Sequence, residues 1–322
     1  MKKQFLVAFG AGLASALLFV VSAKGTSAAA LIAYFTALPI LIAALGFGHM
    51  TGLAGALIGA GAVAVGLGPL LAAFYALCFA LPGWWLGYLA LLARPAPVAA
   101  STESAVPPAL LWYPVGRLVT WTAGLAAAAV LVLGLTVLVR YGSYEAASSV
   151  LAQRLDEAVE QTPSSPSAAL VFVRLLPLAM AASLFLMLAL NIWLAARVAR
   201  ASDRLRRPWP NVPDGLRLPK SAAIVFVVLL APAFLGGAAG TAAGTVAAPF
   251  GLAFALQGLA SAHVLTRGFA GRGGILALIY LATFVIPVAV VALCLIGLVD
   301  CLFSLRDRRP PRPPATLPSK GV

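Results

Sequence analysis

The sequence predicts an all-α fold, a polytopic transmembrane helical bundle of eight or nine spans. Hydrophobic residues make up 62% of the 322 residues and charged residues only 10%, whereas soluble domains hold about 45–50% and 25%. Residues 28–92 contain no Lys, Arg, Asp or Glu, and this stretch is long enough for three crossings of about 20 residues each. Lipid solvates such apolar surface, which a soluble protein of this size could not bury.

The net charge of +13 reflects basic residues that cluster in the connections and in the C-terminal tail. Anionic headgroups and the excess of Lys and Arg in cytoplasmic loops account for this pattern, so we expect the lipid bilayer as a partner and no nucleic acid. Cysteine and histidine are few: the cysteines form an odd set, and the two histidines lie far apart in sequence. They are Cys78, Cys294, Cys301, His49 and His263. Because CxxC, HExxH and paired-ligand spacings are absent from the sequence, we expect neither a metal site nor a cofactor.

The chain begins with two lysines and an apolar run over residues 5–21. The run exceeds the apolar core of a signal peptide, usually about 7–15 residues, and more apolar sequence follows closely. We therefore expect a retained first span with a cytoplasmic N-terminus. One helix face carries small residues at four-residue spacing: Ala8, Gly12 and Ala16. Such a face favours close helix contact, either within the chain or as a docking face for another membrane subunit.

Glycines and prolines divide the uncharged stretch into the second, third and fourth spans. Residues 46–52 separate the second span from the third, and residues 66–69 separate the third from the fourth. Residues 1–94 therefore hold spans one to four, and Arg94 closes the fourth on the cytoplasmic side. A linker rich in Pro, Ala and Ser, without periodicity, follows over residues 95–113.

Spans five and six are predicted within residues 114–196, with an amphipathic segment between them near residues 144–161. Apolar side chains recur there every four residues while acidic ones take other faces, which indicates a helix on the extracytoplasmic surface. Residues 197–220 carry seven basic residues against two acidic ones. The excess of Lys and Arg in cytoplasmic loops predicts that this basic loop is cytoplasmic.

The C-terminal spans, residues 221–305, allow two counts. Hydropathy favours nine crossings, which would export the basic tail. Charge counting favours eight, with part of residues 237–266 re-entrant or lying along the interface, because the tail then stays in the cytoplasm. The tail, residues 306–322, is basic and too rich in Pro to pack, and we expect it to be disordered.

Signatures of catalysis and of ion coupling are missing from the sequence. There is no GxSxG, no P-loop and no pair of carboxylates with catalytic spacing. Every acidic residue lies outside the middle of a span. Asp300 comes closest, near the end of the last helix, and is kept as a candidate binding residue. Because ion-coupled transport usually needs an ionisable group at depth, we expect neither self-powered transport nor an enzyme.

Two polar groupings are further candidate binding sites. The first consists of Gln257, His263 and Arg267. The last two are four apart and can interact on one helix face; the alternatives are an interhelical hydrogen bond and an interface anchor. The second consists of Pro82, Trp84 and Trp85. Its proline frees a backbone carbonyl inside a span, and such broken helices line cavities when functional; the alternative is a kink beside an aromatic belt.

The end of the last helix has a Gly-Leu-x-Asp pattern followed by an aromatic residue and an arginine: Gly297, Leu298, Asp300, Phe303 and Arg306. Together with the sequence QGLASAHVLTRG over residues 257–268, this end resembles the YybS-like family of predicted bacterial membrane proteins, a domain of unknown function. The resemblance covers most of the chain. It implies a multi-pass protein of the bacterial cytoplasmic (inner) membrane and no defined reaction.

The N-terminal half is also similar to the substrate-binding S components of energy-coupling-factor vitamin transporters. The similarity is carried by the small-residue first helix and by the segments LPILIAALGFG, TGLAGALIGAGAV and ALPGWWLGY, in the order of their second to fourth helices. It implies small-molecule binding, with energy supplied by partners that dock on the first helix. Spans beyond six depart from that pattern.

The leading hypothesis is an inner-membrane protein without enzymatic activity that binds a small ligand or a membrane partner and is related to transport. The alternative is a structural or assembly protein without a ligand. The third hypothesis is an intramembrane enzyme that uses isolated polar groups.

Overall fold

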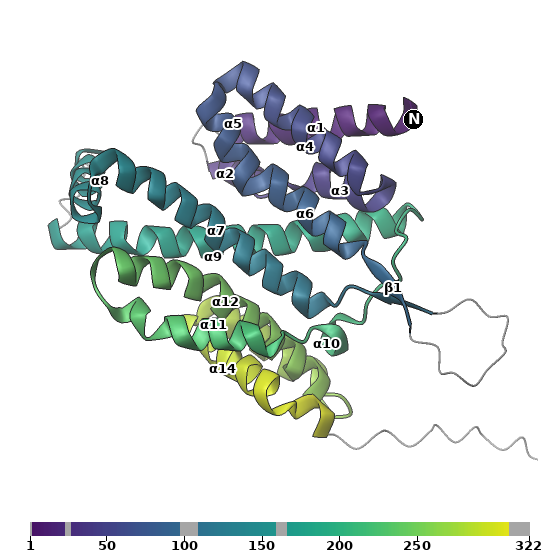
Figure 1. Ribbon diagram of the computed structural model, residues 1–322. Coiled ribbons are helices and arrows are strands. Elements are labelled where there is room, and N and C mark those ends of the chain that lie inside the picture. The colour runs from purple at the N-terminus through teal and green to yellow at the C-terminus, as the bar shows by residue number, and fades with distance from the viewer. Residues whose placement is uncertain (1, 23–26, 97–108, 159–165, 309–322) are drawn as a thin grey trace, which may run out of the picture.

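The computed structural model describes residues 2–22, 27–96, 109–158 and 166–308, and these residues form a bundle of helices (Figure 1). The elements in chain order are α1 (Lys2–Ser22), α2 (Ser27–Ala33), α3 (Leu38–Phe47), α4 (His49–Leu67), α5 (Pro69–Tyr75), the π-helix η1 (Ala76–Ala80), α6 (Leu81–Ala90), β1 (Ala93–Pro95), β2 (Leu110–Trp112), α7 (Val115–Tyr141), α8 (Tyr144–Ala158), α9 (Pro166–Ala201), α10 (Val212–Gly215), α11 (Lys220–Leu230), the 3-10 helix η2 (Pro232–Phe234), α12 (Gly237–Leu265), α13 (Arg272–Val285), α14 (Pro287–Phe303) and the 3-10 helix η3 (Leu305–Arg308). The predicted all-α polytopic bundle is confirmed.

Within the described residues, six helical segments are long and apolar enough to cross a membrane. They are α1, α4, the continuous α5–η1–α6, α7, α9 from residue 171, and α12; a seventh results if the bent pair α13 and α14 counts as one span. The predicted eight or nine spans are not confirmed. The apolar segments Leu31–Phe47 and Lys220–Phe234 are shorter than the roughly 20 residues that a crossing needs, although their composition matches that of a span.

The break in the C-terminal part lies elsewhere than the sequence predicted. Residues 237–265 form one continuous helix with Pro249 inside it, so the expectation of a re-entrant segment within residues 237–266 is wrong. The chain bends by 120° between α13 and α14 instead. Pro287 begins α14, and Ile286 before it is extended, with φ −117° and ψ 105°, because a residue preceding proline avoids the helical region.

The connection between α6 and α7 contains regular structure that the lack of periodicity did not predict. β1 and β2 pair antiparallel, with Arg94 opposite Leu111. The N–H of Tyr113 donates to the carbonyl of Leu92 at 2.9 Å, which continues the ladder toward the helices. This pairing supplies partners for backbone groups where α6 ends and α7 begins. The middle of the predicted linker, residues 97–108, lies outside the described residues.

The small-residue face of α1 packs inside the chain. Its three predicted docking residues, Ala8, Gly12 and Ala16, are buried, and α4 covers them. A Cβ atom placed on Gly12 would lie 2.5 Å from the carbonyl oxygen of Gly55 and 3.0 Å from the backbone nitrogen of Gly59. The opposite face carries exposed Leu6 and Leu17, which contact lipid. Docking of another subunit on the small-residue face would therefore require α4 to move away.

The basic loop lies at the same end of the bundle as the N-terminus and the start of α4. α1 runs parallel to α4, since Ala8 meets Gly55 and Gly12 meets Gly59, so the N-terminus lies at the end where α4 begins. Arg204 from the basic loop stacks on Phe47 at the end of α3, 4.5 Å from the ring centroid. In Figure 1 this end also holds β1 and α10, whereas α8 lies at the opposite end.

Candidate functional site

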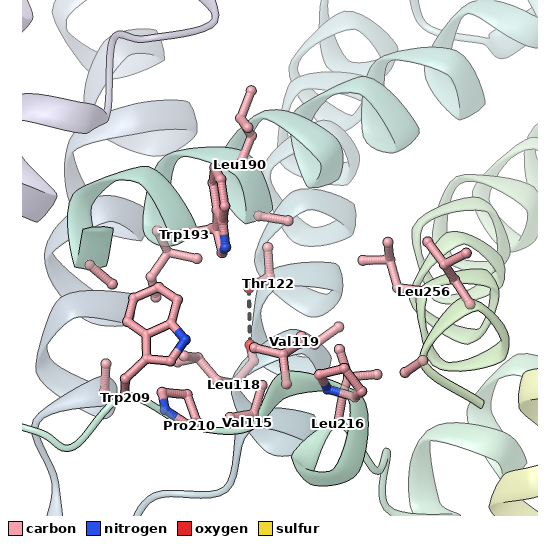
Figure 2. Close-up of a pocket in the computed structure, with 18 of the residues that line it drawn as sticks. Val115, Leu118, Val119, Thr122, Leu190, Trp193, Trp209, Pro210, Leu216 and Leu256 are labelled. Atoms are coloured by element: carbon pink, nitrogen blue, oxygen red, sulfur yellow. Dashed lines mark hydrogen bonds between the residues drawn. The ribbon is translucent and has the colours of Figure 1, made fainter. Parts of the chain in front are cut away.

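A cavity of about 580 Å³, here called the main cavity, lies among the described residues between α7, α9, α12 and the connection after α9. Its walls are almost entirely apolar (Figure 2). Leu118, Val119 and Thr122 come from α7, and Leu190 and Trp193 come from α9. Leu256 contributes from α12. Thr122 does not offer its hydroxyl proton to the cavity, because that group donates to the carbonyl of Leu118 at 2.9 Å.

The connection after α9 closes the cavity at the basic end of the bundle. Trp209, Pro210 and Leu216 from this connection line the cavity (Figure 2). The guanidinium groups of Arg197 and Arg200 lie over the Trp209 ring, 5.7 and 5.2 Å from its centroid. Cations over a tryptophan face are attracted by the ring quadrupole, so these two arginines are held beside the basic end of the cavity.

A second, polar cavity of about 240 Å³ adjoins the first. Leu205, Arg207 and Trp209 line both cavities, and Arg200 and Asp203 complete the smaller one. Arg207 donates to the carbonyl of Ala90 at 3.4 Å, and burial lowers the pKa of its guanidinium. A half-buried arginine therefore stands at the boundary between an apolar and a polar compartment.

A buried ion pair fixes the connection that closes the cavity. Arg306 donates to Asp300 at 2.7 Å, and each of the two side chains is only 1% exposed. The same guanidinium donates to the carbonyl of Pro213 at 2.6 Å and to that of Leu216 at 2.8 Å. Ser304 makes this possible, because its left-handed conformation, with φ 52°, turns the chain after α14. Two residues that line the cavity, Pro213 and Leu216, are thereby tied to the end of α14.

Gln257 on α12 completes this network. Its side-chain NH₂ donates to Asp300 at 2.7 Å, and its carbonyl oxygen accepts from the N–H of Leu218 at 2.8 Å. Gln257 is buried, and all of these bonds are within the chain. A buried polar network whose members are satisfied makes the local arrangement rigid. The network therefore supports the cavity wall and leaves Gln257 and Asp300 engaged with each other.

Two exposed ion pairs brace the same connection on the surface. Arg267 contacts Asp214 at 2.8 Å, and Arg217 contacts Asp307 at 2.5 Å. The hydrogen bond from Arg267 lowers the pKa of the Asp214 carboxyl, and the hydrogen bond from Arg217 lowers that of Asp307. Because a carboxyl with a lowered pKa stays ionised further into acid, both pairs hold at neutral pH.

The first predicted polar grouping does not form one site. Gln257 joins Asp300 in the buried network, and Arg267 pairs with Asp214 on the surface. His263 lines the main cavity, and its Nε2 is 2.9 Å from the hydroxyl of Tyr280 on α13. Gln257 and His263 diverge because residues six positions apart on a helix point in different directions, and Arg267 lies in the turn after Leu265, where α12 ends. Of the three, His263 belongs to the cavity itself.

The second predicted grouping is a packed aromatic cluster. Pro82 does not break the span, since residues 69–90 form one continuous helical segment. The π-helix η1 precedes the proline, and the N–H of Leu81 bonds there to the carbonyl of Ala76, five residues earlier. The Trp85 ring packs against Trp84 and against Trp121 of α7, with centroids 5.8 and 5.7 Å away. Neither tryptophan of the grouping lines the main cavity.

Sequence reasoning missed the residues at the basic end of the cavity. Trp193 lies within the predicted sixth span and has no polar neighbour pattern that would mark it, and Arg207 and Trp209 belong to the basic loop, whose charge pattern indicates mainly the membrane topology. The sequence signal that could have identified them is RRPWP over residues 206–210, which places an aromatic ring next to two arginines. The predicted tail also began too early: Arg306 is buried, whereas residues 309–322 lie outside the described residues.

Comparisons with known proteins identify a family and no characterised relative. Neither the curated proteins nor the solved structures yielded a match to this chain, and the resemblance to S components is not shown. A family model described as a predicted membrane protein (DUF2232) matches residues 13–301. That range contains the cavity and the Asp300 end of the network, and the expected membership in a family of membrane proteins without a defined function is confirmed. The chain belongs to the DUF2232 family of predicted membrane proteins.

Proposed function

We propose that this protein binds a largely apolar small molecule, taken up from the bilayer, in the main cavity between α7, α9 and α12. The observation that carries the proposal is the cavity itself. Its volume of about 580 Å³ lies within the range of small-molecule sites, roughly 300–1,000 Å³. Its lining is apolar apart from a few polar groups near the basic end, as expected for a ligand held by van der Waals contact.

Exposed side chains at the edge of the cavity support access from lipid. Leu190 and Trp193 on α9 are 40% and 46% exposed, and Tyr280 on α13 is 49% exposed. These residues line the cavity and belong to helices whose outer faces are apolar. A hydrophobic molecule dissolved in the bilayer would reach the cavity between α9 and α13 without crossing water.

Binding, rather than self-powered transport, fits the state of the buried carboxylate. Asp300 is committed to Arg306 and Gln257, so it carries a structural charge at the end of the last helix. Secondary transporters use ionisable groups that change partners during the cycle. If the bound molecule is moved across the membrane, the energy has to come from partner subunits.

We place the basic end of the bundle on the cytoplasmic side of a bacterial cytoplasmic membrane, with the N-terminus on the same side. The seven basic residues of the loop 197–220 support this orientation. In spheroplasts, a membrane-impermeant maleimide should label a cysteine placed at Ser143 and leave one placed at Ser202 unlabelled. The three native cysteines are buried and give little background. The reverse labelling pattern would overturn the orientation.

Filling the cavity tests the proposed function. Ala189 on α9 lines the cavity, and the substitution Ala189→Trp should occupy the space in which a ligand tail lies. Native mass spectrometry of the detergent-solubilised chain, titrated with the uncharged lipid monooleoylglycerol, is expected to show saturable binding of one molecule. Ala189→Trp should weaken this binding at least about tenfold, a change of roughly 1.4 kcal/mol.

Ala182→Trp is the matched control, since Ala182 lies two helical turns away on α9 and does not line the cavity. It adds the same ring to the same helix and should leave binding unchanged. Equal effects of the two substitutions, or no saturable binding by the unmodified chain, would overturn the cavity proposal. Either result would favour a structural or assembly role without a ligand.

A further inference from the structure

The polar cavity has room for a second, polar part of the proposed ligand. Apolar and polar compartments of about 580 and 240 Å³ share Leu205, Arg207 and Trp209. One molecule can therefore reach from the larger compartment into the smaller one past Arg207. Such a molecule has an apolar tail and a compact polar head.

The charges around the polar cavity select the sign of that head. Its lining contains two arginines, Arg200 and Arg207, and a single carboxylate, Asp203. Among the described residues, three ion pairs are formed, and none of them includes any of these three side chains. Arg197, whose guanidinium also lies over Trp209, adds a further positive charge nearby. The positive excess is not neutralised by a carboxylate held against it.

Arg207 is the side chain whose position calls for an anion. Burial costs its guanidinium part of its hydration, which lowers its pKa, and its protein partner is the carbonyl of Ala90 at 3.4 Å, a long and neutral contact. A buried charge is stabilised by a counter-charge with good hydrogen-bond geometry. The planar fork of arginine matches two oxygens of a phosphate, and it is more strongly engaged by a phosphate than by a neutral headgroup.

We propose that the ligand is an anionic lipid with a phosphate monoester headgroup, whose phosphate binds Arg207 and Arg200 in the polar cavity while its acyl chain fills the main cavity. This inference rests on the proposed function and adds the chemical class of the ligand. It also fixes the direction of the bound molecule, because the headgroup lies at the basic end of the bundle, level with the lipid phosphates of that leaflet.

Four probes distinguish binding through the headgroup from binding through the acyl chain. Oleoyl lysophosphatidate has both features, monooleoylglycerol lacks the phosphate, oleoyl lysophosphatidylcholine masks its charge, and glycerol 3-phosphate lacks the tail. Titration of the full chain, followed by native mass spectrometry, should rank lysophosphatidate at least about tenfold above the two uncharged or zwitterionic lipids, because hydrogen bonds to charged groups contribute a tenfold or larger factor. Glycerol 3-phosphate should bind weakly or not at all.

Arg207→Gln should remove this preference, and its circular dichroism spectrum and melting temperature in detergent, compared with those of the unmodified chain, show whether the variant is folded. Arg207→Lys should restore part of the preference, since it keeps the charge and loses the fork. Arg206→Gln is the matched control, because exposed Arg206 lines neither cavity, and it should leave the preference intact.

The outcomes separate the two proposals. Equal binding of all three lipids, with loss in Ala189→Trp, overturns the anionic headgroup and leaves the cavity proposal standing. Tight binding of glycerol 3-phosphate alone would make the site one for a free phosphate compound and overturn the lipid assignment. If Arg206→Gln and Arg207→Gln lower lysophosphatidate binding equally, general attraction to a basic surface explains the preference and the assigned site is wrong.

Discussion

The substitution Arg306→Gln is expected to lower the free energy of unfolding by about 3–5 kcal/mol, the cost of removing one partner from a buried ion pair. The change leaves Asp300 buried without its counter-charge, bonded to the side chain of Gln257 and to the backbone N–H of residue 306. It also removes the donors that serve the carbonyls of Pro213 and Leu216. Titration of the detergent-solubilised chain with sodium dodecyl sulfate, followed by circular dichroism, measures the loss.

Two further variants isolate the buried charge from the arginine side chain. Arg217→Gln removes an exposed arginine from its pair with Asp307 and should change stability far less, because solvent screens exposed pairs. The double variant Asp300→Leu with Arg306→Met should recover much of the loss, since apolar replacement of both charges avoids an unpaired one. Equal losses in Arg306→Gln and Arg217→Gln would show that the buried pair does not hold the end of the bundle together.

The same substitution connects stability to the cavity. Pro213 and Leu216 line the cavity and are held by Arg306, so Arg306→Gln should also weaken lysophosphatidate binding at temperatures where the variant is folded. The side chain itself lines neither cavity. Weaker lysophosphatidate binding in Arg306→Gln therefore reports how the connection is positioned. Arg207→Gln acts at the ligand, so it should change the headgroup preference in addition to the affinity.

The helical architecture could be predicted from the sequence because lipid imposes simple rules on composition. Uncharged stretches of about 20 residues and their glycine breaks locate helices directly: α3 ends at Phe47 and α4 at Leu67, within the breaks at residues 46–52 and 66–69. Composition does not determine whether a short apolar helix crosses the membrane or whether a long apolar segment bends within it. The short segments Leu31–Phe47 and Lys220–Phe234 and the bend at Ile286 depend on packing, and they are where the predicted count departed.

The candidate site could be predicted only in part, because it joins residues that are distant in sequence. Asp300 was recognised as the acidic residue nearest a span, but its partner Gln257 lies 43 positions earlier. Arg207 is a candidate only because it lines both cavities. No spacing of residues in the sequence predicts that the basic loop and α7 line the same cavity. The small residues of α1 signalled close packing correctly, whereas the sequence left open which helix they contact.

Gly297→Leu is expected to be strongly destabilising, because it forces apart two helices that meet backbone to backbone. A Cβ atom on Gly297 would lie 1.9 Å from the carbonyl oxygen of Phe254, and one on Gly258 would lie 1.9 Å from the carbonyl oxygen of Leu293. These obstacles are backbone atoms, so rotation of a side chain cannot relieve the clash and α12 must separate from α14. The loss should exceed the roughly 1–3 kcal/mol of ordinary overpacking.

Separation of these helices would also pull Asp300, one turn after Gly297 on α14, away from Gln257 on α12. Gly134→Leu on α7 is the control, because no atom lies within 4 Å of a Cβ placed there and the added side chain would face lipid. Thermal unfolding in detergent should show a large fall in melting temperature for Gly297→Leu and almost none for Gly134→Leu. Similar melting temperatures for the two variants would mean that α12 and α14 do not meet backbone to backbone, because only that contact distinguishes one glycine from the other.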